Sequence, residues 1–178
     1  MNKNYIDVTK EWLREAIPNS HKVEEQLYYE SDGVKYEVDG KKVVLDYSKK
    51  EREVAEWLEN TFGGEIKMIP RVNYPKNIMT QDYIFRGMKF DLKIIMGNGN
   101  KTIDSALKSK KNQATNFILD ISKTTLPLEK VKNQIQKIYS SYNRLWLNII
   151  ILKDDNKLIC VYKRKKKLTT SPNNMDQD

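Results

Sequence analysis

The sequence predicts an α+β fold in which helices flank a sheet of short strands. Three observations point to this class: segments with apolar residues at helical spacing, short runs that alternate or are continuously apolar, and glycine-containing turns between them. The chain has 178 residues, of which 39% are hydrophobic and 31% charged. These values suit one globular domain with short extensions.

The first 47 residues are expected to form a helix and a small β-meander. Residues 9–16 can form an amphipathic helix around Trp12, which Pro18 ends. Three short runs with strand character follow, separated by Asp-Gly pairs that tolerate the positive φ of tight hairpin turns. They are residues 27–30, 34–38 and 42–45. We interpret residues 1–47 as a unit separate from the rest.

Residues 48–164 are expected to form the main domain. Its first helix begins at a capping box formed by Ser48 and Glu51, and Gly63 and Gly64 end it. The other expected elements are strands at 65–69, 82–85, 89–95, 116–121, 145–152 and 157–162, and helices at 102–114 and 128–142. Residues 165–178, which are basic and polar, are expected to be a disordered tail.

The composition excludes several classes of protein. The start of the chain lacks the apolar stretch of a signal peptide and no apolar run is long enough to span a bilayer, so we expect a cytoplasmic protein with no membrane partner. Cys160 is the only cysteine, which excludes an internal disulfide and a cysteine-based zinc site, and its apolar strand pattern predicts burial. His21, the only histidine, lies in a polar stretch and is expected at the surface.

The chain is basic. It holds 32 Lys and Arg against 24 Asp and Glu, a net charge of +8, which favours polyanionic partners without identifying one. Two segments concentrate the positive charge, residues 163–167 and the stretch that holds Lys101, Lys108, Lys110 and Lys111. We interpret the first as mainly a solvated chain end and the second as a candidate anion-binding segment.

Asp82, Asp91 and Lys93 form the first candidate site. Residues i and i+2 of a strand share a face, so Asp91 and Lys93 project together while Phe90 and Leu92 enter the core. The expected turn after residue 85 brings Asp82 beside Asp91 across a hairpin. This arrangement also has a plainer interpretation, as a cross-strand charge cluster on a solvated face.

The following helix adds to this candidate site. Thr102 is predicted to be its N-cap, and the loop of residues 97–100 is predicted to leave backbone N–H groups free for an anion. Lys101, Lys108 and Lys111 supply positive charge, the last two on one helix face. Together with the strand, this helix start could cradle a scissile phosphate and stabilise the charge that builds on its oxygens.

Three blocks of the sequence resemble a known family. Residues 80–93, 100–106 and 110–121, with the lead-in 63–72, are similar to the C-terminal tRNase domain of CdiA-type contact-dependent growth inhibition toxins. The same module occurs in phage head-morphogenesis proteins and mobile elements. The resemblance covers roughly residues 48–150 and its motifs are moderately specific.

The resemblance implies a fold and an activity. The fold is the barnase–EndoU–colicin–RelE type, a helix-flanked twisted antiparallel sheet. The activity is metal-independent tRNA cleavage without a cofactor, in which the ribose 2′-OH attacks the adjacent phosphate and leaves a cyclic phosphate. The expected partners are tRNA, an immunity protein and a translation factor.

The family's functional residues carry over to matching positions. Its aspartate before the first hairpin strand matches Asp82, and its acidic-x-Lys motif matches Asp91 and Lys93. Its threonine at the helix start matches Thr102, and the end of its helix matches Lys111 and Gln113. The resemblance implies that Asp82, Asp91, Lys93 and Thr102 are catalytic and that Lys111 and Gln113 bind substrate. Lys101 and Lys108 are further substrate-binding candidates because of their positive charge.

The residues around Asp82 include one departure from the family pattern and three aromatic side chains. The family usually has Thr-Pro-Asp where this chain has Thr80-Gln81-Asp82, so a rigid turn is missing before the aspartate. Tyr74, Tyr83 and Phe85 could stack an unpaired base, or could pack in the core.

Two other functions remain open on the sequence alone. The spacing of Asp82, Asp91 and Lys93 is also that of a PD-(D/E)xK nuclease, in which two carboxylates bind Mg²⁺ and the lysine activates water on a DNA phosphate. The third reading is a non-catalytic basic accessory domain of a phage or mobile element. A requirement for metal separates the two enzymes, and indifference to the loss of Lys93 marks the accessory domain.

Overall fold

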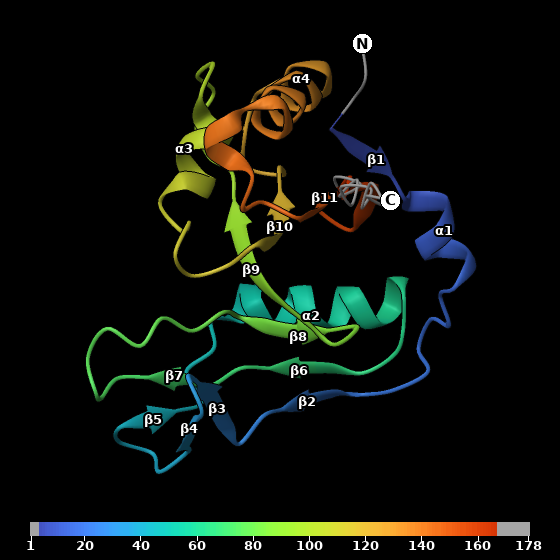
Figure 1. Ribbon diagram of the computed structural model, residues 1–178. Coiled ribbons are helices and arrows are strands. Elements are labelled where there is room, and N and C mark those ends of the chain that lie inside the picture. The colour runs from blue at the N-terminus through green and yellow to red at the C-terminus, as the bar shows by residue number, and fades with distance from the viewer. Residues whose placement is uncertain (1–3, 167–178) are drawn as a thin grey trace, which may run out of the picture.

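The structure, a computed structural model, describes residues 4–166, and its centre is a mixed eight-stranded sheet with helices on both faces (Figure 1). The helices are α1 (Thr9–Arg14), α2 (Lys49–Thr61), α3 (Thr102–Lys108) and α4 (Leu128–Ser140), followed by the 3-10 helix η1 (Tyr142–Arg144). The sheet runs in the order β1 (Tyr5–Asp7), β12 (Lys157–Arg164), β11 (Ile149–Asp154), β10 (Asn116–Asp120), β9 (Met88–Ile94), β8 (Tyr83–Phe85), β6 (Ile66–Met68) and β2 (Val23–Glu25).

The predicted α+β class is confirmed, but the sheet is mixed where an antiparallel one was expected. β9, β10 and β11 run parallel to one another, because α3 connects the first pair and α4 the second. A helical crossover returns the chain to the same end of the sheet, and its neighbour strand is therefore parallel. The tight turns elsewhere, as at Arg86 and Gly87 with φ of 51° and 71°, give the antiparallel pairs.

Helix α2 begins as the sequence predicts. The Ser48 hydroxyl accepts a hydrogen bond from the Glu51 N–H at 3.1 Å, and the Glu51 carboxylate accepts one from the Ser48 N–H at 2.6 Å. This capping box satisfies N–H groups that the first helical turn leaves unpaired. It also fixes the start of α2, and with it Glu51, at one end of the sheet.

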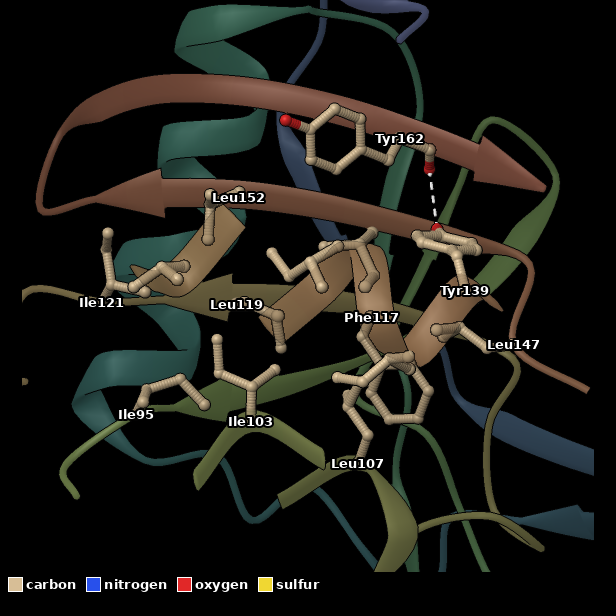
Figure 2. Close-up of a cluster of buried hydrophobic side chains, with 14 of the residues drawn as sticks. Ile95, Ile103, Leu107, Phe117, Leu119, Ile121, Tyr139, Leu147, Leu152 and Tyr162 are labelled. Carbon is tan, nitrogen blue, oxygen red and sulfur yellow. Dashed lines mark hydrogen bonds between the residues drawn. The ribbon is translucent and has the colours of Figure 1, made fainter. Parts of the chain in front are cut away.

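The sheet separates two hydrophobic clusters. α3 and α4 pack on one face, where Ile103 and Leu107 of α3 meet Phe117 and Leu119 of β10 (Figure 2). At the edge of this cluster the Tyr139 hydroxyl donates to the Tyr162 carbonyl at 3.2 Å (Figure 2). α2 covers the other face, where Leu58, Phe62, Phe85, Phe90 and Ile118 meet. Successive residues of a strand therefore face α2 and the α3–α4 pair in alternation.

The N-terminal segment is not the separate unit that we expected. β1 pairs with β12 and β2 pairs with β6, so this segment forms both edges of the described sheet. Trp12 of α1 is buried in the cluster under α2, and residue 47 is therefore not a boundary between two cores.

The predicted meander is also only partly correct. β3 (Tyr28–Ser31) and β4 (Val34–Glu37) form a hairpin, but β5 (Val43–Val44) pairs with β7 (Arg71–Val72) instead of continuing it. The reason is that Asp39 accepts three backbone N–H bonds, from residues 41–43, and turns the chain away from β4.

Several smaller expectations can be compared with the structure. Cys160 is buried and His21 is exposed, as predicted. Within residues 4–166 no helix is long and apolar enough to cross a membrane. Of the expected disordered tail at 165–178, residues 167–178 lie outside the described part of the chain.

Candidate active site

A cleft of about 440 Å³ lies where the start of β8, the middle of β9, the first turn of α2 and the loop after α3 meet. Its polar lining includes four side chains with acid–base or hydrogen-bonding groups from these elements: Glu51, Asp82, Asp91 and Gln113. The cleft also holds the ammonium-bearing Lys110. The predicted hairpin thus brings Asp82 and Asp91 to one cleft. Glu51 and Lys110 line the same cleft, although the sequence does not predict their place in it.

Backbone contacts hold Asp82 in position without the rigid turn that a proline would supply. Its N–H donates to the Phe90 carbonyl at 3.0 Å, and its own carbonyl accepts the Ile69 N–H at 2.9 Å. Its carboxylate accepts the Leu92 N–H at 2.7 Å, which directs the side chain along β9. The preceding Gln81 adds a side-chain amide bond to the Gln113 carbonyl, and so ties this segment to the loop after α3.

Asp91 is 2% exposed and is contacted from that same loop. The Gln113 amide donates to Asp91 Oδ1 at 3.0 Å, and Lys110 donates to the Gln113 amide oxygen at 2.7 Å. Asp91 Oδ2 is buried and has no hydrogen-bond partner among residues 4–166. A buried carboxylate oxygen without a partner is costly, so a proton or a hydrogen-bond donor that reached this atom would relieve that cost.

The pKa values of both carboxyl groups are raised. Burial, and after it the charge of Asp91, raises the pKa of Asp82 to about 7. Burial also raises the pKa of Asp91, but the Lys110 and Lys93 ammonium groups counteract this. Two buried carboxyl groups this close do not ionise together easily, so the pair keeps a proton to a higher pH than two ordinary aspartates would. A pair that holds one proton can act as both acid and base.

Lys93 lies two residues beyond Asp91 on the same face of β9 and is half-buried. Burial lowers its pKa first, and the neighbouring Lys110 lowers it further, while Asp91 and Asp82 oppose the change. Two ammonium groups thus lie near two carboxyl groups in a place partly shielded from water. Charges in such surroundings act more strongly on a bound phosphate than they would at an exposed surface.

The raised pKa of Asp82 predicts how stability depends on pH. Because the folded-state pKa of about 7 exceeds the ordinary value of 3.8, the contribution of Asp82 is full below pH 3.8 and is lost as the pH rises through about 7. We therefore expect Asp82→Asn to raise the free energy of unfolding by on the order of 2 kcal/mol at pH 8, and by little at pH 4. Asparagine keeps an oxygen for the Leu92 N–H and cannot ionise.

Urea unfolding followed by tryptophan fluorescence at pH 4, 6 and 8 measures this difference. Asp154→Asn, at an exposed position beside the β11–β12 turn, is the matched control and should leave the pH profile unchanged. A variant at Asp82 that is destabilised equally at all three pH values would contradict the raised pKa.

Not all the predicted residues reach the cleft. Thr102 is the first residue of α3 and not its N-cap, which is Lys101 and makes no side-chain cap. The Ile103 N–H at this helix start donates to Gln134 Oε1 at 3.1 Å, so α4 occupies a position that we expected to be free for an anion. The expectation failed because a residue 31 positions away supplies the cap.

The predicted substrate-binding residues are spread over the surface around the cleft. Gln113 lines it, whereas Lys93, Thr102 and the exposed Lys101, Lys108 and Lys111 do not. Lys111 lines a second pocket beside the cleft. The roles assigned to these residues and to Thr102 stay predictions.

Two residues of the cleft were not singled out from the sequence. Lys110 was one of several lysines in a basic run, and only the turn after α3 directs it at Gln113 and Asp91. Glu51 was recognised only as half of a capping box, but it also lines the cleft and its charge raises the pKa of Asp82. Neither carries a local sequence signal that places it in the cleft.

Asp120 forms ion pairs away from the cleft, and two of the three aromatic candidates are buried. Asp120 is paired in register with Ile94, on the α2 face, and bonds Lys50 and Lys153, so it lies away from the Asp91 face. Tyr83 and Phe85 are fully buried, which rules out base stacking and leaves the core-packing alternative. Tyr74 is 61% exposed.

Within residues 4–166 no group of three His, Cys, Asp or Glu side chains is arranged to hold a metal ion.

Comparison with known proteins agrees with the resemblance seen in the sequence. Residues 79–158 match the family model of the contact-dependent growth inhibition CdiA C-terminal domain, and the expected resemblance is confirmed over this segment. The chain is also similar to a structure of a CdiA-CT/CdiI toxin and immunity complex from Burkholderia pseudomallei, at 24% identity and a TM-score of 0.49, over 62% of this chain and 80% of that one. No curated protein matches.

Proposed function

We propose, because residues 79–158 match the CdiA C-terminal toxin domain family, that this protein is a toxin nuclease that cleaves tRNA in the cleft of Asp82 and Asp91. The observation that carries the proposal is that two buried carboxyl groups with raised pKa values lie in one cleft, near the half-buried ammonium groups of Lys93 and Lys110. General acid–base cleavage of a phosphodiester requires these parts.

In the proposed reaction the Asp91 carboxylate accepts the proton of a ribose 2′-OH. The 2′ oxygen forms a bond to the adjacent phosphorus, and the bond from phosphorus to the 5′ oxygen breaks. Asp82 gives its proton to that leaving oxygen, so the products are a cyclic phosphate and a 5′-hydroxyl. Lys93 and Lys110 stabilise the charge on the phosphate oxygens as it builds.

The remaining predicted residues act outside this centre. Gln113 orients Asp91, and Lys101, Lys108 and Lys111 contact neighbouring phosphates, which positions the substrate without reading its sequence. Thr102 stays a predicted phosphate contact. We further propose a cytoplasmic site of action and an immunity protein as the neutralising partner, with a translation factor as a further partner.

A second candidate is the Mg²⁺-dependent PD-(D/E)xK reaction. Asp91 Oδ2, a buried carboxylate oxygen without a partner among residues 4–166, is the observation that favours it. Asp82 and Asp91 would supply two carboxylate ligands of a divalent cation, and the ion would activate water and stabilise charge on a DNA phosphate. Lys93 would then hold or orient the water from the same face of β9.

Incubation of the purified chain with total tRNA and with duplex DNA, each with and without EDTA, tests both functions. We expect discrete tRNA fragments that persist in EDTA and end in a cyclic phosphate, and no cleavage of DNA. Cleavage that requires Mg²⁺ would select the second candidate. Cleavage of DNA but not of tRNA would show that the substrate is DNA. No cleavage of either substrate would contradict both reactions.

A further inference from the structure

A second pocket, of about 280 Å³, adjoins the active cleft. Gln81 and Gln113 line both spaces and form the wall between them. The Gln81 amide donates to the Gln113 carbonyl, and the Gln113 amide donates to the Thr80 carbonyl. The two side chains therefore form a cross-linked bridge from the start of β8 to the loop after α3, and the pockets lie on its two sides.

The charges on the two sides of this bridge differ. The cleft is lined by four acidic side chains, Asp46, Glu51, Asp82 and Asp91, and by two cationic ones, Arg71 and Lys110. Among the described residues, the charged groups that line the second pocket are both positive, those of Lys89 and Lys111. The acidic groups of the cleft offset its cationic ones, so phosphate contacts beside the cleft would add to the attraction of a nucleic acid.

The two lysines are placed to supply such contacts. Lys89 is held in position, because its ammonium donates to the Glu30 carbonyl at 3.3 Å and lies 4.6 Å from the centroid of the Tyr29 ring. An ammonium has three donors, so Lys89 keeps some for a ligand. The Lys111 side chain is exposed and makes no ion pair or hydrogen bond within residues 4–166. Its charge is uncompensated.

The rest of the pocket suits a nucleotide. Its lining has two apolar side chains, the half-buried Met88 and the buried Ala114, beside the buried Asn116. Asn112 and Thr115, also in the lining, are exposed and can hydrogen-bond a base or a ribose. Apolar, hydrogen-bonding and ammonium groups in one pocket match the parts of a nucleotide: base, ribose and phosphate.

We propose that this pocket is a second RNA subsite, which binds the nucleotide next to the scissile phosphate and holds its phosphate between Lys89 and Lys111. The proposal rests on RNA cleavage in the adjacent cleft, because the bridge of Gln81 and Gln113 then lies under the chain where it passes from one pocket to the other. The subsite contributes binding and register, and the cleft contributes the chemistry.

The double variant Lys89→Ala/Lys111→Ala tests the subsite in steady-state cleavage of tRNA. We expect KM to rise about tenfold at low salt while kcat changes little. The dependence of log affinity on log salt concentration should become weaker, with the magnitude of its slope reduced by about 2. Lys123→Ala/Lys137→Ala is the matched control, since it removes the same charge from exposed positions outside both pockets. A KM equal to that of the control would overturn the proposal, as would a fall in kcat and melting temperature without a change in the salt slope.

A binding measurement separates failure of the subsite from failure of the proposed function. Fluorescence anisotropy with a labelled single-stranded RNA oligonucleotide reports binding whether or not the chain cleaves RNA. If the wild type cleaves no RNA, the proposed function fails, and the subsite is still decided by affinity. Weaker binding in the Lys89/Lys111 variant than in the control supports it, and equal binding overturns it.

Discussion

Replacing Lys93 with alanine is expected to reduce tRNA cleavage by about 10²–10³-fold. Lys93 is half-buried on the face of β9 that carries Asp91, in surroundings that lower its pKa by burial and by the charge of Lys110. A positive charge shielded from water stabilises a phosphate transition state far more than it stabilises the bound substrate. The loss should therefore appear in kcat, measured by single-turnover cleavage at saturating enzyme.

The variants at this position also distinguish charge from structure. Lys93→Arg keeps a positive charge and should recover part of the rate, although the guanidinium differs in shape and cannot be deprotonated. Lys123→Ala, an exposed lysine outside the cleft, is the control and should cleave at the wild-type rate. Wild-type cleavage by Lys93→Ala would remove Lys93 from the site, and RNA binding without any cleavage by the wild type would favour the accessory-domain alternative.

The elements that the sequence predicts well are those whose signals are local. The capping box fixes the start of α2, and the apolar stripe of residues 128–142 predicts α4, which spans Leu128–Ser140. The direction of the strands and the partners of the N-terminal segment depend on contacts between distant residues. β1 pairs with β12 across almost the whole chain, and no pattern within residues 5–7 indicates this pairing.

The candidate site divides in the same way. Asp82, Asp91 and Lys93 could be grouped from the sequence, because a hairpin and the alternation of a strand place them together. Lys110 and Glu51 could not, since one reaches the cleft through the turn after α3 and the other through the position of α2. The expected anion site at the start of α3 failed for a similar reason, because Gln134 of α4 binds the N–H group there.

Asp120 belongs to the block of residues 110–121 that resembles the toxin family, but it lies on the opposite face of the sheet from Asp91. Its carboxylate is fully buried and bonds Lys50 at 2.8 Å and Lys153 at 3.1 Å. Burial alone would raise its pKa, but the bonds from Lys50, Ser122 and Lys153 hold the pKa of Asp120 well below its usual range. A depressed pKa means that this stabilisation is present above the ordinary aspartate pKa and is lost as the pH falls through the folded-state value.

Asp120→Ala is expected to lower the free energy of unfolding by about 3–5 kcal/mol at neutral pH, measured by urea unfolding. The variant leaves the Lys153 ammonium, on a side chain only 2% exposed, without a counter-charge inside the protein. Lys50, whose side chain is 28% exposed, can turn to solvent, so Lys153 carries most of the loss.

The double variant Asp120→Leu/Lys153→Met removes both buried charges and should recover most of the stability, because a buried ion pair contributes little beyond what apolar side chains of similar volume would. Its cleavage rate, measured at a temperature where the chain is folded, should match the wild type, since neither residue faces Asp91. A double variant that is stable and does not cleave RNA would instead place Asp120 in the catalytic machinery, and a single variant as stable as the wild type would show that water reaches Lys153.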